Sequence, residues 1–300
     1  MFKQRMKKTC FSGWLVAGIL FCTSLMEAHP GSGIVVDRNG NVYFVDTGSG
    51  VWKVSPDGSL GRVPGPAYHW MAMDIDGRLR NASLHFSRGD ATVTPVGEHP
   101  TLLLASDFPI AVGLNGNLYY PWFDDRLNIQ CRTPSGTTSV LAESVKSPGR
   151  KPPRWLNGMA VGPDSTIYYT ENDAVRKISP WGSISTVVEN ITVSDCDSLN
   201  VTGEYNGVYL RGIDVDARGT IYAAATGCCC VLEISGRGTV RTVLKSQRPW
   251  SPTGVAVSGD ELYVLEYFHT AGENRREWLP RVRKVSRDGS VRTIAEITHR

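Results

Sequence analysis

Three side chains with hard oxygen donors stand at the edges of short apolar runs in this 300-residue sequence. Asn157 directly precedes one run, whereas Glu171 and Glu266 end two others. Amide and carboxylate oxygens are the donors that Ca²⁺ and Mg²⁺ prefer. If the fold brings the three together, they could hold calcium or another divalent cation.

A second set of side chains could bind or act on a substrate. His69 is a candidate general base, and Arg211 could donate paired hydrogen bonds to a carboxylate or to a polyhydroxylated ligand. Glu266 is the third candidate catalytic residue. The candidates for ligand binding are Ser32, Phe108, Trp122 and Thr253.

An internal repeat supplies the elements that must position these residues. Its clearest copy runs from Gly33 to Gly58 and combines a short apolar strand, an Asn-Gly turn, an alternating strand and a hairpin of two more strands. Five further copies follow it along the chain. The units cover residues 31–66, 68–107, 108–144, 154–190, 209–247 and 250–299.

Six such units predict an all-β fold, a six-bladed β-propeller with four antiparallel strands per blade. A single sheet of this size cannot cover its own two faces, and a radial arrangement buries them against neighbouring sheets. The composition, with 41% hydrophobic and 20% charged residues, is compatible with a large core. A β-solenoid would require shorter and more even repeats.

The repeat also predicts where the candidate residues meet. In a propeller the first strand of each blade lies innermost and starts at the face where the second strand ends. The residues at these two places therefore form two rings at one mouth of the central channel. The first ring is Ser32, His69, Phe108, Asn157, Arg211 and Thr253, and the second is Asp46, Ser83, Trp122, Glu171, Ala225 and Glu266.

Residue types in both rings differ from blade to blade, while the flanking Gly, apolar and Tyr positions stay similar. This divergence favours a mouth shaped for a ligand. Unconstrained sequence variation at an exposed loop edge would give the same pattern. Aromatic side chains near the rings could stack on a sugar or another planar ligand. Packing between blades is the alternative role for many of them.

The cysteines predict a covalent link at the same face. Cys196 lies in the long connection before the fifth unit, and the consecutive Cys228, Cys229 and Cys230 follow the second strand of that unit. A disulfide from Cys196 to one of the three would hold the connection in place, and a bridge within the triplet is the alternative. Metal binding lacks the usual paired Cys or His spacing.

The N-terminus has the layout of a signal peptide over residues 1–28. Basic residues between Lys3 and Lys8 precede an apolar run from Phe11 to Met26, and Ala28 follows. The run is too short to span a bilayer comfortably. We therefore expect an exported, extracytoplasmic protein, periplasmic or secreted, with no transmembrane segment in its mature part.

These repeats resemble the NHL-repeat propellers, whose unit reads Gly-Ile-Ala-Val-Asp, a turn with Gly, and then Asn-Val-Tyr-Val-Ala-Asp. They are also similar to the related senescence-marker-protein/gluconolactonase superfamily. The resemblance covers essentially the whole mature chain. It implies the propeller fold, but it does not imply one activity, because such scaffolds include lyases, lactonases and non-catalytic binders.

The gluconolactonase-like resemblance implies a divalent cation held in the channel by Glu, Asn and Asp from different blades. The segment Leu156 to Ala160 matches one of the ligand motifs of that superfamily, but Ser32 and Arg211 stand where further acidic ligands are expected. The lyase branch of the NHL propellers uses several channel histidines on zinc, and only His69 is placed for that role here.

The sequence as a whole favours a binding or recognition protein for a small molecule or a glycan. A metal-dependent lactonase or esterase is the alternative, followed by a lyase, and whether the protein is an enzyme stays open. A protein partner is compatible with the sequence. We expect a monomer. Nucleic acid is not an expected partner, because the basic residues from Arg275 to Arg287 alternate with acidic and aromatic ones and because the protein is expected to be exported.

Overall fold

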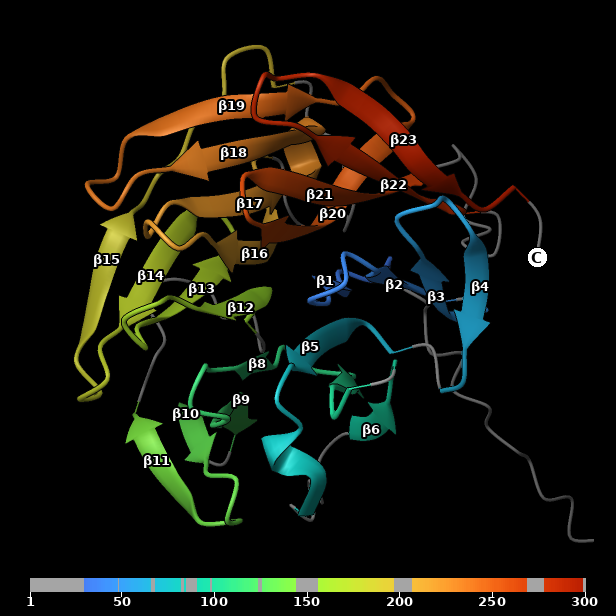
Figure 1. Cartoon of the computed structure of the whole chain (residues 1–300). Helices are drawn as coiled ribbons and strands as arrows, with labels where there is room; N and C mark the ends of the chain where they lie inside the picture. Colours follow the sequence, from blue (N-terminus) through green and yellow to red (C-terminus); the bar gives the residue numbers. More distant parts are fainter. Residues whose placement is uncertain are drawn as a thin grey trace, which may run out of the picture.

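The computed structural model describes residues 30–47, 49–65, 68–81, 84, 91–97, 99–123, 126–143, 156–196, 207–268 and 278–298. The expected signal peptide, residues 1–28, lies outside this part. The chain forms six antiparallel sheets arranged as blades around a central channel, as predicted (Figure 1). Within the described part, no helix is long and apolar enough to cross a membrane.

Five blades are sheets of four strands in sequential order. Blade 1 contains β1 (Ile34–Val36), β2 (Val42–Asp46), β3 (Gly50–Val54) and β4 (Leu60–Val63). Blade 3 contains β8 (Ala111–Val112), β9 (Leu118–Phe123), β10 (Leu127–Arg132) and β11 (Thr138–Ala142). Blade 4 contains β12 (Gly158–Val161), β13 (Ile167–Glu171), β14 (Ala174–Ile178) and β15 (Ile184–Val188).

The last two blades follow the same order. Blade 5 contains β16 (Leu210–Val215), β17 (Ile221–Ala225), the short 3-10 helix η2 (Thr226–Cys228), β18 (Cys230–Ile234) and β19 (Val240–Lys245). Blade 6 contains β20 (Trp250–Ser258), β21 (Glu261–Phe268), β22 (Pro280–Val285) and β23 (Val291–Glu296). No strand is shared between blades 6 and 1, so packing between them closes the ring.

Blade 2 departs from this order. It contains β5 (Trp70–Asp74), the 3-10 helix η1 (Arg78–Asn81), β6 (Ala91–Pro95) and β7 (Leu102–Ser106). The described part of its sheet has the order β5-β7-β6. The fully buried β7 suits the place beside the inner strand, whereas β6 is only partly buried and lies further out. Sequential order was expected here, but the apolar content of β7 places it second.

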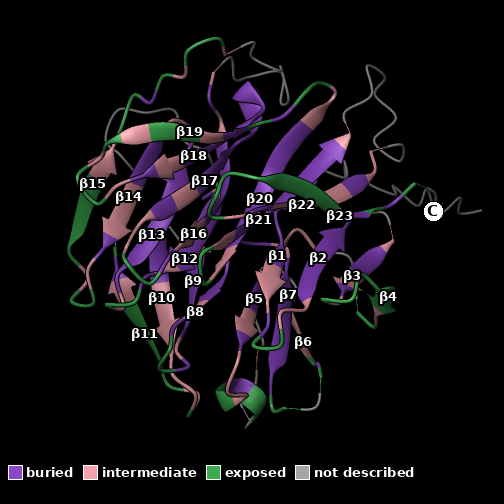
Figure 2. Cartoon of the chain, turned by 45° about the horizontal axis from the view of Figure 1, so that its top comes forward, coloured by how far each residue is buried: buried purple, intermediate pink, exposed green. Residues whose placement is uncertain are grey.

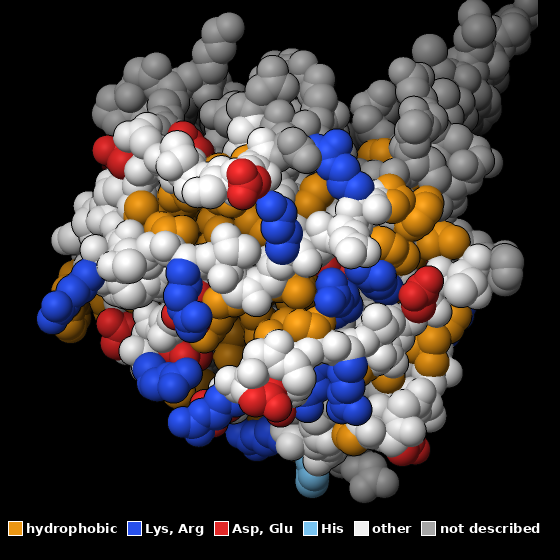
Figure 3. Space-filling view, turned by 90° about the horizontal axis from the view of Figure 1, so that it is seen from above, with side chains coloured by type: hydrophobic (Ala, Val, Ile, Leu, Met, Phe, Trp, Pro, Cys, Tyr) orange, Lys and Arg blue, Asp and Glu red, His pale blue; other side chains and the backbone are white. Residues whose placement is uncertain are grey.

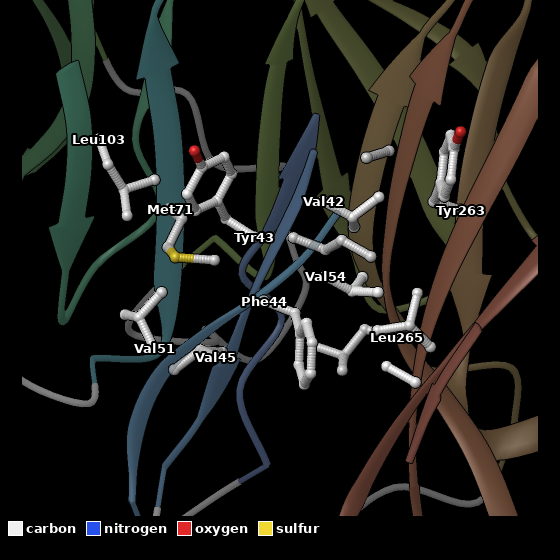
Figure 4. Close-up of a cluster of buried hydrophobic side chains, with 14 of the residues drawn as sticks. Val42, Tyr43, Phe44, Val45, Val51, Val54, Met71, Leu103, Tyr263 and Leu265 are labelled. Carbon is white, nitrogen blue, oxygen red and sulfur yellow. The ribbon is translucent and has the colours of Figure 1, made fainter. Parts of the chain in front are cut away.

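Hydrophobic side chains between neighbouring blades form the core. Figure 2 shows that buried residues concentrate in the inner strands and exposed ones at the rim. Figure 4 shows one cluster, in which side chains of blade 1 such as Tyr43 and Phe44 lie between Met71 and Leu103 of blade 2 and Leu265 of blade 6. Each blade thus covers the sheet faces of its neighbours, as the repeat predicted.

Glycines at the start of four inner strands permit the closest contacts between blades. A Cβ atom on Gly212 would lie 2.6 Å from the Cα of Gly254 in the next blade. A Cβ atom on Gly33 would lie 2.9 Å from Met71 N. On Gly158 and Gly254 it would overlap the backbone oxygens of Arg211 and Ser32, respectively. The recurring glycine of the repeat therefore has a packing role rather than a turn role.

We predict that Gly254→Ala lowers the free energy of unfolding by about 2–4 kcal/mol, because the added methyl group must displace the backbone of blade 1. Urea unfolding followed by circular dichroism would measure the change. Gly61→Ala is the matched control, since nothing lies within 4 Å of its Cβ position. Equal effects of the two substitutions would contradict this role of Gly254.

Candidate functional site at the channel mouth

A network of hydrogen bonds joins blades 4, 5 and 6 at the predicted mouth of the channel. The Asn157 side chain in blade 4 donates to Leu210 O in blade 5 over 2.9 Å. Thr170 Oγ1 donates to Arg211 O over 2.8 Å. Between blades 5 and 6, Thr226 Oγ1 donates to Pro252 O over 2.7 Å. Polar side chains of blades 4 and 5 are thus bound to the backbone of the next blade.

The network continues into blades 1 and 2. Thr253 Oγ1 of blade 6 donates to Gly31 O over 2.7 Å, and Ser32 N donates to His69 O over 2.7 Å. Hydrogen bonds therefore link blades 4 and 5, 5 and 6, 6 and 1, and 1 and 2. These are the same four junctions at which a glycine permits close backbone contact. Close approach of the backbones is therefore what brings these partners within hydrogen-bond distance.

A tryptophan links blade 2 directly to blade 4, without a contact to blade 3 in this bond. Trp70 in blade 2 donates its indole N–H to Asn157 O in blade 4 over 3.1 Å. Trp70 and Pro109 occupy the positions at which the other four blades have glycine. Their bulk accounts for the different arrangement on this side of the mouth. Trp70 was not among the predicted site residues, although its place in the repeat singles it out.

Arg211 spans the mouth from blade 5 to the segment that precedes blade 1. Its side chain is 7% exposed, and Nη2 donates to Pro30 O over 2.5 Å. Burial lowers the pKa of the guanidinium from its ordinary value. Glu171 binds Arg176, and Asp214 accepts a hydrogen bond from Val257 N. Among the described residues, no carboxylate forms a salt bridge with Arg211.

Ser32 and His69 lie next to the segment that Arg211 contacts. Ser32 is 6% exposed, and its hydroxyl has no hydrogen-bond partner within the described ranges. His69 Nδ1 lies 3.6 Å from Asp107 Oδ1, and both side chains are partly accessible to solvent. Arg211, Ser32 and His69 therefore place a cation, a hydroxyl and an imidazole at one side of the mouth.

Asp107 was missed at the sequence level because the order of strands in blade 2 was not anticipated. Ser83, which was expected in the second ring, lies outside the described residues. In the structure β7 takes the second place in the sheet, and Trp70 pairs with Ser106. The residue after Ser106 therefore stands beside His69.

The candidate metal ligands Asn157, Glu171 and Glu266 each bind a protein group in the structure. The Asn157 amide donates to a backbone oxygen. Glu171 Oε2 accepts from Arg176 Nε over 2.8 Å. Within the residues that the structure describes, no group of three or more His, Cys, Asp or Glu side chains could hold a metal ion. The role of Asn157, Glu171 and Glu266 as ligands of a divalent cation stays a prediction.

Glu266 forms a buried ionic cluster inside blade 6. Its carboxylate is completely inaccessible, accepts from Arg281 Nε over 2.5 Å and also from the hydroxyl of Ser246. Arg283 Nη1 lies 3.6 Å from its other oxygen. Arg281 is stacked on the ring of Trp250, 3.9 Å from the centroid. Glu266 thus serves as a counter-ion rather than as a free catalytic group.

The remaining ligand-binding candidates are mostly part of the protein interior. Phe108 is buried, and its ring centroid lies 6.4 Å from that of Tyr120. Thr253 is fully buried and bound to Gly31 O. Trp122 is partly buried and packs against the same cluster as Phe108. Of these residues, Trp122 is the one that retains exposed surface.

A disulfide joins Cys196 and Cys228 across a separation of 32 residues. It attaches the connection before blade 5 to the end of η2, next to the mouth. Cys229 and Cys230 are free and buried, and burial raises the pKa of both thiols, to about 11 for Cys230. The free thiols are therefore protonated at neutral pH, and the disulfide is the cross-link on this face.

Comparison with solved structures finds the same fold in several proteins of low sequence identity. A streptogramin B lyase has 13% identity and a TM-score of 0.51, with 92% of this chain and 86% of that chain covered. A luciferin-regenerating enzyme has 16% identity and a TM-score of 0.51, with 80% and 85% covered. The calcium-binding protein regucalcin from Agrobacterium tumefaciens has 14% identity and a TM-score of 0.50, with 81% and 83% covered.

At these identities the similarity establishes the six-bladed propeller fold alone. No protein-family model matches the chain, and no curated protein matches it. The expected likeness to gluconolactonase-like proteins is supported at the level of the fold, and the NHL repeat stays a prediction.

We predict that Glu266→Ala lowers the free energy of unfolding by about 3–5 kcal/mol, because it removes a buried carboxylate and leaves two partly buried guanidinium groups without a counter-ion. Glu233→Ala is the matched control. It removes a carboxylate from an exposed pair with Arg241 and should cost less than about 1 kcal/mol. Chemical unfolding of both variants would measure the difference. A mild effect of Glu266→Ala would show that the cluster does not stabilise blade 6.

Proposed function

We propose that this protein binds a small anionic organic molecule, such as a sugar acid, at the channel mouth with Arg211 as the principal anchor. The observation that carries the proposal is the burial of Arg211 without a carboxylate partner among the described residues. A guanidinium withdrawn from water is costly unless hydrogen bonds or an anion compensate for it. A bound carboxylate would supply that compensation.

The neighbours of Arg211 suit such a ligand. The planar guanidinium presents five N–H donors and matches a carboxylate with two parallel hydrogen bonds. One donor is used on Pro30 O. The unpaired hydroxyl of Ser32, two residues further along, could bind a ligand hydroxyl, and the His69 imidazole could bind another. Recognition would then combine one charge with several polar contacts.

The surface character is compatible with a small-molecule ligand. Figure 3, which shows the side of the molecule uppermost in Figure 1, shows Lys and Arg side chains interspersed with Asp and Glu. Arg241 pairs with Glu233, and Arg287 with Asp260. Because acidic partners neutralise these basic groups, they do not favour nucleic acid binding. Export, a monomeric state and the absence of a nucleic acid partner belong to this proposal.

A hydrolase of lactones or esters is the second candidate, and the His69–Asp107 pair is the observation that favours it. A carboxylate beside an imidazole can orient the ring and stabilise its protonated form, as a general base requires. We assign no metal-dependent step to this pair. Binding without turnover remains the preferred function.

We predict that glucuronate raises the melting temperature of the protein and that glucose, which lacks the carboxylate, does not. Stabilisation should grow with the logarithm of glucuronate concentration above the dissociation constant. Arg211→Gln should abolish the shift, and Arg241→Gln, which alters an exposed ion pair, should preserve it. An equal shift with glucose in the unaltered protein would contradict the anchor role of Arg211, whether or not Arg211→Gln folds.

We also predict that neither 5 mM CaCl₂ nor EDTA changes the melting temperature, because Asn157, Glu171 and Glu266 are bound to protein groups. Differential scanning fluorimetry would measure this, together with hydrolysis of a lactone and a p-nitrophenyl ester. A calcium-dependent hydrolysis that Asn157→Ala abolishes would show that the protein is a metal-dependent hydrolase and would overturn the proposed binding role.

A further inference from the structure

The six inner strands enclose a cavity of about 210 Å³ along the channel axis. Its lining residues come from all six blades. Apart from Asp214 they have apolar side chains, and backbone groups contribute a polar part of the lining surface. Asp214 of β16 is the single charged residue among the lining residues. An ionisable group in such surroundings needs a specific reason, because aliphatic neighbours do not compensate its charge.

The other blades do not have a carboxylate at this position. Asp214 is the second residue after the glycine that begins the inner strand of the repeat. The equivalent residues are Val35, Ala72, Ala111, Ala160 and Ala256. A side chain required by the scaffold would recur from blade to blade. The aspartate is therefore a feature of blade 5 and is not needed to form an inner strand.

The contacts of Asp214 leave part of its acceptor capacity unused. Oδ2 accepts from Val257 N over 2.7 Å, and Oδ1 accepts from Val215 N over 2.8 Å. Each carboxylate oxygen can accept two hydrogen bonds. Among the described residues, no Lys, Arg or His forms a salt bridge with Asp214. The side chain is partly accessible from the channel.

We propose that the channel cavity binds a small primary amine with an aliphatic tail, its ammonium group on Asp214 and its methylene groups against the aliphatic lining. The ammonium group would donate to the free acceptor positions of the carboxylate and balance its charge. The tail would bury apolar surface against residues such as Val36, Val112 and Val161. This site lies inside the channel and does not depend on the anion site proposed at the mouth.

A divalent cation is a poorer match for the same cavity. Calcium takes six to eight oxygen ligands and magnesium six in octahedral geometry. The lining side chains supply one carboxylate, and the others are aliphatic side chains and methionine thioethers, which are poor ligands for these cations. Such a cavity favours an organic cation that combines one charged group with an apolar body.

Isothermal titration calorimetry of the full chain with n-hexylamine at pH 7.5 tests the proposal, with 1-hexanol as the uncharged analogue. We expect saturable binding of hexylamine and at least tenfold weaker binding of hexanol. Asp214→Asn retains a hydrogen-bond acceptor but removes the charge, and should weaken hexylamine binding at least tenfold. Asp216→Asn, which removes a carboxylate held in the following turn, is the matched control and should leave it unchanged.

Acid should weaken the same binding. Burial raises the pKa of Asp214 to about 6, with a smaller contribution from the nearby charge of Asp216. Asp216 lies in the turn after β16, and the hydrogen bonds that it accepts from Thr220 and Arg218 outweigh burial and lower its pKa. Arg211, on the same strand as Asp214, stays protonated over this pH range. At pH 5 most Asp214 carboxyl groups are therefore neutral, whereas Asp216 stays ionised. We expect hexylamine to bind several-fold more weakly at pH 5 than at pH 7.5.

Three results would overturn the proposal. The first is no saturable binding of hexylamine, and the second is equal binding of hexanol. Both concern the unaltered protein, so they remain informative if Asp214→Asn does not fold. The third is unchanged hexylamine binding by a folded Asp214→Asn variant. That result would show that Asp214 only accepts backbone hydrogen bonds and does not bind the amine.

Discussion

The close approach of inner strands in neighbouring blades is the contact on which the rest of the structure depends. Each blade has two apolar faces that only its neighbours can cover, so the strands nearest the axis must come together with little space between them. At four of the six junctions the backbone of the next blade occupies the place of a side chain. Glycine permits this contact because it has no side chain. It recurs at the start of the inner strands because the backbones of neighbouring blades pack directly against each other there.

The same approach determines the chemistry of the mouth. Because the backbones lie close, polar side chains such as Thr170 and Thr253 reach carbonyl groups of the next blade and satisfy them. Trp70 and Pro109 replace two of the glycines, and there a single indole N–H links blade 2 to blade 4. The mouth is therefore asymmetric, with a polar arc over blades 4, 5, 6 and 1 and an apolar part at blade 3.

Charges near the axis divide into two kinds. Glu171 and Glu266 are neutralised within their own blades by arginines of the third strand, so they stabilise the sheet and leave little capacity for a ligand. Arg211 and Asp214 lie three residues apart on the same inner strand and have no such partner among the described residues. Unbalanced charge at positions that are largely withdrawn from solvent is costly for folding. Its presence at these two positions distinguishes them from the structural ion pairs.

The sequence by itself determined the fold, because the repeat encodes it locally. A turn glycine, an alternating strand and a hairpin recur at a regular spacing, and each can be recognised without its neighbours. The positions of His69, Asn157 and Arg211 at the start of inner strands follow from the same spacing. For the cysteines the sequence predicted a bridge from Cys196 to one of Cys228, Cys229 and Cys230, or a bridge within that triplet, without deciding between them.

Only the tertiary structure decided how the ring residues are used. Arg211 contacts Pro30, which is 181 residues away, and no local pattern encodes such a contact. The order of strands in blade 2 depends on which strand is buried more fully, and this placed Asp107 beside His69. The aspartate in the channel was visible in the sequence, but its isolation among aliphatic side chains from six blades exists only once the ring has closed.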